Sequence, residues 1–161
     1  MSGFKEIISK GEEERYKYLE DFLLASCYAG ISLGNAGCAA VHALSYSIGG
    51  AFHVTHGESN YLFFTEVLKT YAKKNPAGKI KEAAKLFADI LECGESCDVY
   101  EELEVFLNKL IIKRPLREYG MTESQIDEFT ESTVENQQRL LGNNYVFLEK
   151  DEIRKIFADL F

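Results

Sequence analysis

Apolar residues recur at intervals of three and four positions along most of the chain, which is the spacing of one face of an α-helix. A long helix is predicted from Glu12 to about Leu33, carried by Tyr16, Leu19, Phe22, Leu23, Ser26, Cys27 and Gly30. Gly34, Asn35 and Gly37 follow it, and such residues commonly end helices. A second helix is predicted from about Cys38 to Ile48, and its small side chains predict a central position in the fold.

The remainder of the chain predicts further helices separated by stop signals. They are expected over Glu58–Lys73, Lys79–Glu92, Asp98–Ile112, Thr122 to about Leu140, and a short stretch that begins near Lys150. Thr122 and Gln125 have the spacing of a capping box, in which each side chain bonds the other residue's backbone N–H. Strand patterns are scarce. The sequence therefore predicts an all-α, multi-helix bundle.

Length and composition fit one helical domain over residues 1–161. The chain has 161 residues, of which 46% are hydrophobic, and this is enough to bury one core but not two. The net charge of −8 and the pI near 5.0 make the surface repel phosphate backbones. We therefore expect no nucleic-acid partner.

The chain also lacks the sequence signals of membrane insertion and export. No apolar run reaches the roughly 18 to 20 residues needed to cross a bilayer, and Glu and Lys stand where a signal peptide is apolar. We expect a cytoplasmic protein with no membrane partner. The four cysteines are accordingly predicted to be free thiols, with pairing of Cys93 and Cys97 as the alternative.

All three histidines of the chain, His42, His53 and His56, fall within one stretch of fifteen residues. Imidazole is the commonest metal ligand and changes its charge near neutral pH, so the clustering predicts one site of chemistry. A lone histidine on an apolar helix is more often a hydrogen-bonded core residue, and spacing alone leaves this alternative open.

A shared metal ion would require the chain to turn back between His42 and His56. On one straight helix these residues would lie roughly 21 Å apart, whereas two ligands of one ion are close neighbours. Gly49-Gly50 is predicted to supply the break, because adjacent glycines weaken a helix. Two histidines leave a metal underligated, so either His53 or Glu58 completes the set or the other ligands lie on another polypeptide.

Several short motifs around these histidines resemble one enzyme family. They are Gly34-Asn35-Ala36-Gly37, Val41-His42-Ala43-Leu44, Gly49-Gly50, and His56-Gly57 followed by Asn60. In order and spacing they resemble the iron-containing alcohol dehydrogenases. The resemblance covers roughly Glu12 to Phe161 and corresponds to the helical C-terminal domain of those enzymes.

The resemblance implies that His42 and His56 are two of four metal ligands, with Fe(II) or Zn(II) as the ion. It also implies that an Asp and another His come from an N-terminal α/β dinucleotide-binding half, which is absent from this chain and binds most of the NAD. That half would be the principal partner, and a small hydroxy acid or aldehyde the substrate. The complete protein would be an NAD-dependent alcohol dehydrogenase, and this chain alone would be inactive.

Other residues of the stretch receive weaker assignments. Tyr46 stands where many family members carry another histidine near the nicotinamide, so it is a candidate for catalysis and cofactor contact, or else a packed aromatic ring. His53 is a candidate for contact with substrate or cofactor. Gly49 and Gly50 would let the cofactor ring approach the backbone, or would only make the turn. Glu58, in the first turn of the next helix, is expected to be structural.

Two further expectations concern partners. A substrate carboxylate would need a cation, and the histidine stretch contains no Lys or Arg, which leaves Lys69 and the absent half as candidates. Apolar surface facing the absent half would make the chain a homo-oligomer. The alternative reading is a free-standing helical binding or assembly module that keeps the fold and has lost catalysis.

Overall fold

The computed structural model describes residues 1–94 and 97–161, and within them every regular element is helical. The predicted all-α class is therefore confirmed for the described residues. In chain order the elements are α1 (Ser2–Lys10), η1 (Glu12–Tyr18), α2 (Leu19–Ala36), α3 (Ala40–Phe52), α4 (His56–Lys74), α5 (Gly78–Leu91), α6 (Val99–Asn108), η2 (Leu116–Tyr119), α7 (Ser124–Asn136), α8 (Gln138–Leu141) and α9 (Lys150–Leu160), where η marks a 3₁₀ helix.

Some helix boundaries differ from the predictions. The helix predicted from Glu12 starts as the 3₁₀ turn η1, and the stretch from Thr122 to Leu140 is divided into α7 and α8 at Gln137. Gln125 accepts a hydrogen bond from the Thr122 backbone N–H at 2.9 Å, which is half of the predicted capping box. A complete capping box forms instead at the start of α9, between Glu149 and Glu152.

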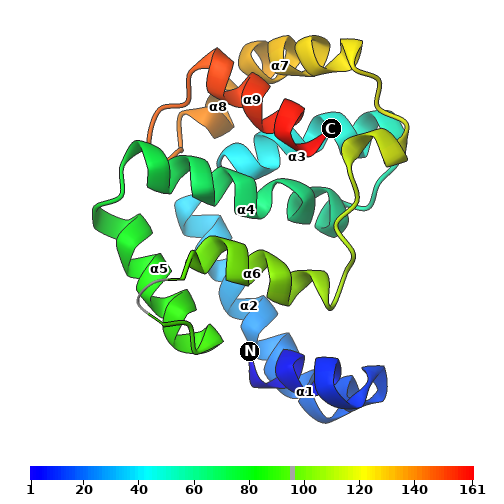
Figure 1. Ribbon diagram of the computed structural model, residues 1–161, viewed down its shortest axis with the longest axis vertical. Coiled ribbons are helices and arrows are strands. Elements are labelled where there is room, and N and C mark those ends of the chain that lie inside the picture. The colour runs from blue at the N-terminus through cyan, green and yellow to red at the C-terminus, as the bar shows by residue number, and fades with distance from the viewer. Residues whose placement is uncertain (95–96) are drawn as a thin grey trace.

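Helices α7 and α9 lie over α3 and α4 (Figure 1). Four phenylalanines, one from each of these helices, connect them. Phe63 of α4 meets Phe157 of α9 with 5.4 Å between ring centres. Phe129 of α7 lies 6.3 Å from Phe157 and 6.1 Å from Phe52 of α3. These edge-on and tilted contacts are the geometry that aromatic pairs prefer. They hold α3, α4, α7 and α9 in one core.

The segment from α1 to α2 projects from this core (Figure 1). It has a small cluster of its own, in which Phe4 and Phe22 stack with 5.0 Å between ring centres. No residue of α2 is buried, although the helix is rich in apolar side chains. Leu23 is 71% exposed and Tyr28 is 62% exposed. The long amphipathic helix predicted at the start of the chain therefore exists, but its apolar face is not covered by the described residues.

The prediction for the cysteines was wrong in part. Cys93 and Cys97 form a disulfide, while Cys27 and Cys38 are free. The chain leaves α5 through Glu92 in the left-handed conformation, and the Cα atoms of the two cysteines lie 6.2 Å apart. This separation is within the range that a disulfide spans.

Among the described residues, no single helix is both long and apolar enough to cross a bilayer. The segments Glu12–Ala36 and Ala40–Phe52 reach that length and apolar composition only when taken together, and a bend of 106° separates them.

We predict that Phe157→Ala destabilises the fold by about 3 to 5 kcal/mol, because it removes a fully buried ring that touches two others. Phe147→Ala is the matched control, since Phe147 is 70% exposed and should cost within about 0.5 kcal/mol. Urea denaturation followed by circular dichroism measures both. Equal losses would contradict the core described above.

Candidate metal centre

The corner between α3 and α4 brings two of the histidines together. A break is predicted at Gly49-Gly50, but helix α3 continues through both glycines to Phe52. Neither glycine has a positive φ. The reversal is made by His53, which takes the left-handed conformation with φ 55° and ψ 29°. The glycine prediction was wrong because glycine only permits a helix break, whereas the packing of α3 on α4 favours a longer helix.

The rings of His42 and His56 lie side by side across this corner. Their centres are 5.1 Å apart and their planes differ by 9°. An ion bound about 2.0–2.1 Å from a ring nitrogen lies roughly 3 Å from the ring centre, so two imidazoles that share it have centres within about 6 Å. The observed separation satisfies this limit. The predicted meeting of the two rings is therefore found, although a different residue makes the turn.

His42 is held in the form that a metal requires. Burial lowers the pKa of its imidazole, and the neighbouring His56 lowers it further. A lowered pKa favours the neutral ring at pH 7, and only a neutral imidazole has a lone pair to donate. Nδ1 of His42 is buried and has no hydrogen-bond partner among the described residues. The donor types and the unpartnered nitrogen fit a divalent ion.

The described residues supply only part of a coordination sphere. They contain no group of three or more His, Cys, Asp or Glu side chains placed to hold an ion. Glu58 is engaged elsewhere, because its Oε1 accepts a hydrogen bond from the Tyr119 hydroxyl at 2.8 Å. Burial, together with this bond, raises the pKa of Tyr119 to about 12. Glu58 therefore links α4 to η2, as its predicted structural role requires.

Tyr46 and His53 differ in their relation to the histidine pair. The Tyr46 ring lies 6.5 Å from the ring centre of His42 and 6.2 Å from that of His56, and Tyr46 is 44% exposed. It therefore borders the pair on an open side. His53 is exposed at the corner. Gly49 lies against Ser59 of α4, and Gly50 faces open space.

Two polar side chains that the sequence places in a loop, and not in the site, hold the start of α3. Asn144 Oδ1 accepts the Ala40 backbone N–H at 2.8 Å and the Tyr71 hydroxyl at 2.7 Å. Asn143 Nδ2 donates to the carbonyl oxygens of Ala36 and Cys38. The Asn-Asn turn thus fixes the bend between α2 and α3, and so the position from which His42 projects. The adjacent pair of Asn residues was the available signal, but it predicts a turn and not its target.

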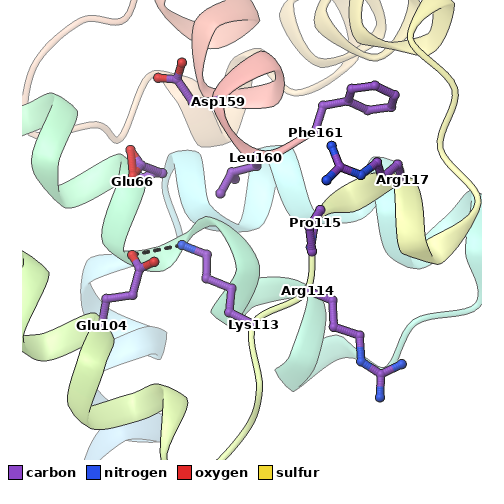
Figure 2. Close-up of a pocket in the computed structure, with 9 residues that line it drawn as sticks. All are labelled: Glu66, Glu104, Lys113, Arg114, Pro115, Arg117, Asp159, Leu160 and Phe161. Atoms are coloured by element: carbon purple, nitrogen blue, oxygen red, sulfur yellow. Dashed lines mark hydrogen bonds and ion pairs between the residues drawn. The ribbon is translucent and has the colours of Figure 1, made fainter.

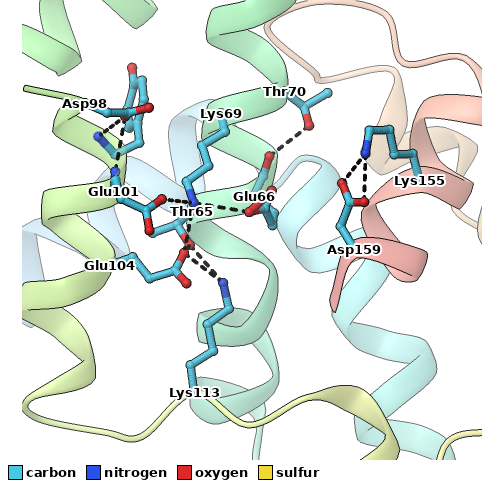
Figure 3. Close-up of polar contacts among 11 residues, drawn as sticks. Thr65, Glu66, Lys69, Thr70, Asp98, Glu101, Glu104, Lys113, Lys155 and Asp159 are labelled. Atoms are coloured by element: carbon cyan, nitrogen blue, oxygen red, sulfur yellow. Dashed lines mark hydrogen bonds and ion pairs between the residues drawn. The ribbon is translucent and has the colours of Figure 1, made fainter. Parts of the chain in front are cut away.

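Lys69, one candidate for binding a substrate carboxylate, is surrounded by acidic side chains (Figure 3). Its Nζ lies 3.2 Å from Glu66, 2.7 Å from Glu101 and 3.4 Å from Glu104. Burial alone would lower the pKa of Lys69, but the bond to Glu101 and the charges of Glu104 and Glu66 outweigh it and raise that pKa. Its positive charge is therefore neutralised within the chain.

A cavity of about 310 Å³ lies beside Glu66 and Glu104, and neither His42 nor His56 lines it (Figure 2). It is lined by Glu66, Glu104, Lys113, Arg114, Pro115, Arg117, Asp159, Leu160 and Phe161. Lys113, whose side chain is 8% exposed, bonds Glu104 at 3.0 Å and the Thr65 hydroxyl at 3.0 Å. This contact joins α4, α6 and the segment before η2. We assign it to stability.

We predict that Glu104→Gln lowers the free energy of unfolding by about 1 to 3 kcal/mol at pH 7, because it leaves the largely buried Lys113 ammonium without its carboxylate partner. Burial raises the pKa of Glu104, but bonds from Thr65 and Lys113 outweigh it and lower that pKa below its ordinary 4.5. The Glu104 carboxylate therefore contributes its full share of the free energy of unfolding above pH 4.5. This stabilisation is lost as the pH falls through the lowered pKa.

Denaturation at several pH values from about 3 to about 7, which cover the range in which carboxylates titrate, measures the loss of stabilisation by Glu104. Glu102→Gln on the exposed side of α6 is the control and should change little. A stability difference that stays constant across the whole pH range would contradict the assignment.

Comparison with known proteins identifies the family. The family model "Fe-containing alcohol dehydrogenase family, C-terminal" matches residues 2–161. The chain therefore belongs to the iron-containing alcohol dehydrogenases and corresponds to their C-terminal part. It is 52% identical to a 4-hydroxybutyrate dehydrogenase from Clostridium kluyveri over all of this chain and 43% of that protein. Within the family, the stretch from His42 to Tyr61 most resembles 4-hydroxybutyrate dehydrogenase, and this identity confirms the resemblance.

More distant relatives extend the same picture. A long-chain-alcohol dehydrogenase from Geobacillus thermodenitrificans is 31% identical over 98% of this chain and 40% of its own length. The fold matches that of a solved archaeal alcohol dehydrogenase from a Red Sea brine pool, with a TM-score of 0.80 and 23% identity over 98% of this chain and 40% of that one. The chain spans less than half the length of these relatives.

Proposed function

We propose that this chain is the metal-ligand-bearing helical half of an NAD-dependent alcohol dehydrogenase that interconverts 4-hydroxybutyrate and succinate semialdehyde. The observation that carries the proposal is the 5.1 Å separation of the His42 and His56 ring centres on a corner that leaves Tyr46 exposed. The similarity to a 4-hydroxybutyrate dehydrogenase supports the substrate. The remaining ligands and most of the NAD site belong to an N-terminal half outside this chain.

His42 and His56 would hold a divalent ion, Fe(II) or Zn(II), through one ring nitrogen each. When bound, the ion supplies polarisation of the substrate oxygen, and NAD exchanges the hydride. The chain's own contribution is to keep the imidazoles of His42 and His56 adjacent at the α3–α4 corner. Imidazole donors do not distinguish strongly between the two metals, so the choice is left to the other ligands and to metal supply.

Tyr46 would border the reacting groups. Its hydroxyl is suited to donate a hydrogen bond to substrate or cofactor. His53, which is exposed at the corner, would contact substrate or cofactor. Gly50 faces open space, so a nicotinamide ring would be able to approach the α3 backbone there, whereas Gly49 lies against Ser59 and would only allow α4 to pack closely. A cation for the substrate carboxylate would come from the N-terminal half, because Lys69 is neutralised.

The apolar face of α2 would be covered by that N-terminal half. Leu23, Tyr28 and Ile31 are each more than half exposed on one helix. A helix that is apolar over so much of its surface is normally buried. The matched relatives carry more than half of their length outside the aligned part, and the family model describes this part as C-terminal. The preceding segment is therefore the occupant that we propose.

A helical module without catalysis is the second candidate. It is favoured only by the absence of a third metal donor among the described residues. The two candidates differ in whether the histidine pair binds a divalent ion.

We predict that Zn²⁺ added to this chain shifts the imidazole NMR signals of His42 and His56 together, while those of His53 stay in place. His42→Ala should weaken Zn²⁺ binding at His56 by about tenfold or more, because one nitrogen donor is then lost. Tyr46→Phe is the matched control and should bind Zn²⁺ as the unchanged chain does. Independent responses of the two rings would contradict a shared site.

We predict that the chain alone elutes in size exclusion as a species larger than its 18.2 kDa, because α2 then pairs with other copies. A variant with Ser at positions 23, 28 and 31 should elute as a monomer. It should also lose binding to the separately produced N-terminal segment of the Clostridium kluyveri relative. Leu86→Ser on α5, where Leu86 is 58% exposed, is the control and should keep both properties. A wild-type chain that is monomeric and does not bind the N-terminal segment would contradict the assignment of the α2 face to that segment.

A further inference from the structure

A chain of hydrogen bonds joins α3 to the ring of His56. The Ser45 hydroxyl donates to Asn60 Oδ1 at 2.6 Å. Nδ2 of the same amide lies 3.0 Å from Nε2 of His56. Ser45 Oγ also lies 3.1 Å from the carbonyl oxygen of His42. One serine thus connects the backbone at one proposed ligand to the imidazole of the other.

Helix geometry places these groups. His42 and Ser45 are three positions apart on α3, and His56 and Asn60 are four positions apart on α4. Residues three and four apart share one face of a helix, so each pair meets the other across the α3–α4 contact. Ser45 is fully buried at that contact. Its hydroxyl therefore has a fixed set of neighbours.

The order of donors and acceptors determines where the proton of His56 resides. The Ser45 hydroxyl has one proton and two acceptors within reach, the His42 carbonyl oxygen at 3.1 Å and Asn60 Oδ1 at 2.6 Å, and the shorter contact takes the proton. The oxygen end of the Asn60 amide therefore faces α3, and the amide N–H₂, which is only a donor, faces Nε2. A ring nitrogen that accepts a hydrogen bond carries no proton. In a neutral imidazole the proton is then on Nδ1.

We propose that Asn60, oriented by Ser45, is a positioning residue that fixes His56 as the neutral tautomer with its proton on Nδ1 and its lone pair on Nε2. The purpose of this arrangement rests on the proposed function, because a metal needs an unprotonated nitrogen held in one direction. The tautomer itself is a property of the metal-free chain. Coordination of an ion at Nε2 would replace the neutral hydrogen bond, so Asn60 prepares this nitrogen for the ion.

Long-range ¹H–¹⁵N NMR correlations of the metal-free chain, recorded above the pH range in which imidazole titrates, distinguish the two tautomers. In the unchanged chain we expect His56 to show a protonated Nδ1 and a bare Nε2. Asn60→Asp should reverse this, because a carboxylate only accepts hydrogen bonds and selects the tautomer with the proton on Nε2. Ser45→Ala should give a mixture, because the amide is then free to turn.

Ser47→Ala, on the same helix and without a side-chain hydrogen bond among those of the described residues, is the matched control and should leave the tautomer unchanged. The proposal is overturned if the unchanged chain carries the proton on Nε2, or if folded Asn60→Asp keeps the wild-type tautomer. The wild-type spectrum decides the matter even if a variant does not fold. If Zn²⁺ moves neither ring while His56 shows the expected tautomer, the metal-binding function fails and the role of Asn60 stands.

Discussion

The packing of α3 against α4 is the contact on which the rest of the arrangement depends. It buries Leu44 and Ile48 of one helix against Leu62 and Phe63 of the other, all at 1% exposure or less. Because the two helices cross with a short connection between them, side chains early in α3 reach the first turn of α4. The hydrophobic contact therefore does more than stabilise the fold, since it also determines which polar groups meet at the accessible corner.

The sequence predicts the helices and the convergence of the two histidines, but not how the corner is made. Helical periodicity and small residues indicate α3, and the separation of His42 from His56 requires a turn. The glycines were a misleading signal, because a glycine pair lowers the cost of a break without demanding one. Histidine is one of the residues enriched in the left-handed conformation that His53 adopts, but this enrichment does not specify at which position of a chain the conformation occurs. The anchoring of α3 by Asn144 depends on contacts between distant parts of the chain.

Charge is handled differently in the two halves of the bundle. Beside α6, lysines and glutamates neutralise one another in a partly closed setting, and the result is a link between helices. Around the histidine pair the described residues form no salt bridge, and burial lowers the pKa of the His42 imidazole, which favours its neutral form. A region whose polar groups are satisfied internally suits a structural role. A buried His42 nitrogen without a hydrogen-bond partner among the described residues, in a ring that lies beside the exposed His56, suits a metal ion.

The three residues between α3 and α4, positions 53 to 55, determine how α4 is oriented relative to α3. Each residue of an α-helix turns the chain by about 100°. Adding or removing a single residue in this connection would therefore displace the start of α4 relative to α3 and move the His56 ring away from His42, while leaving both helices free to form. We therefore expect substitutions at positions 53 to 55 to be tolerated far better than insertions or deletions.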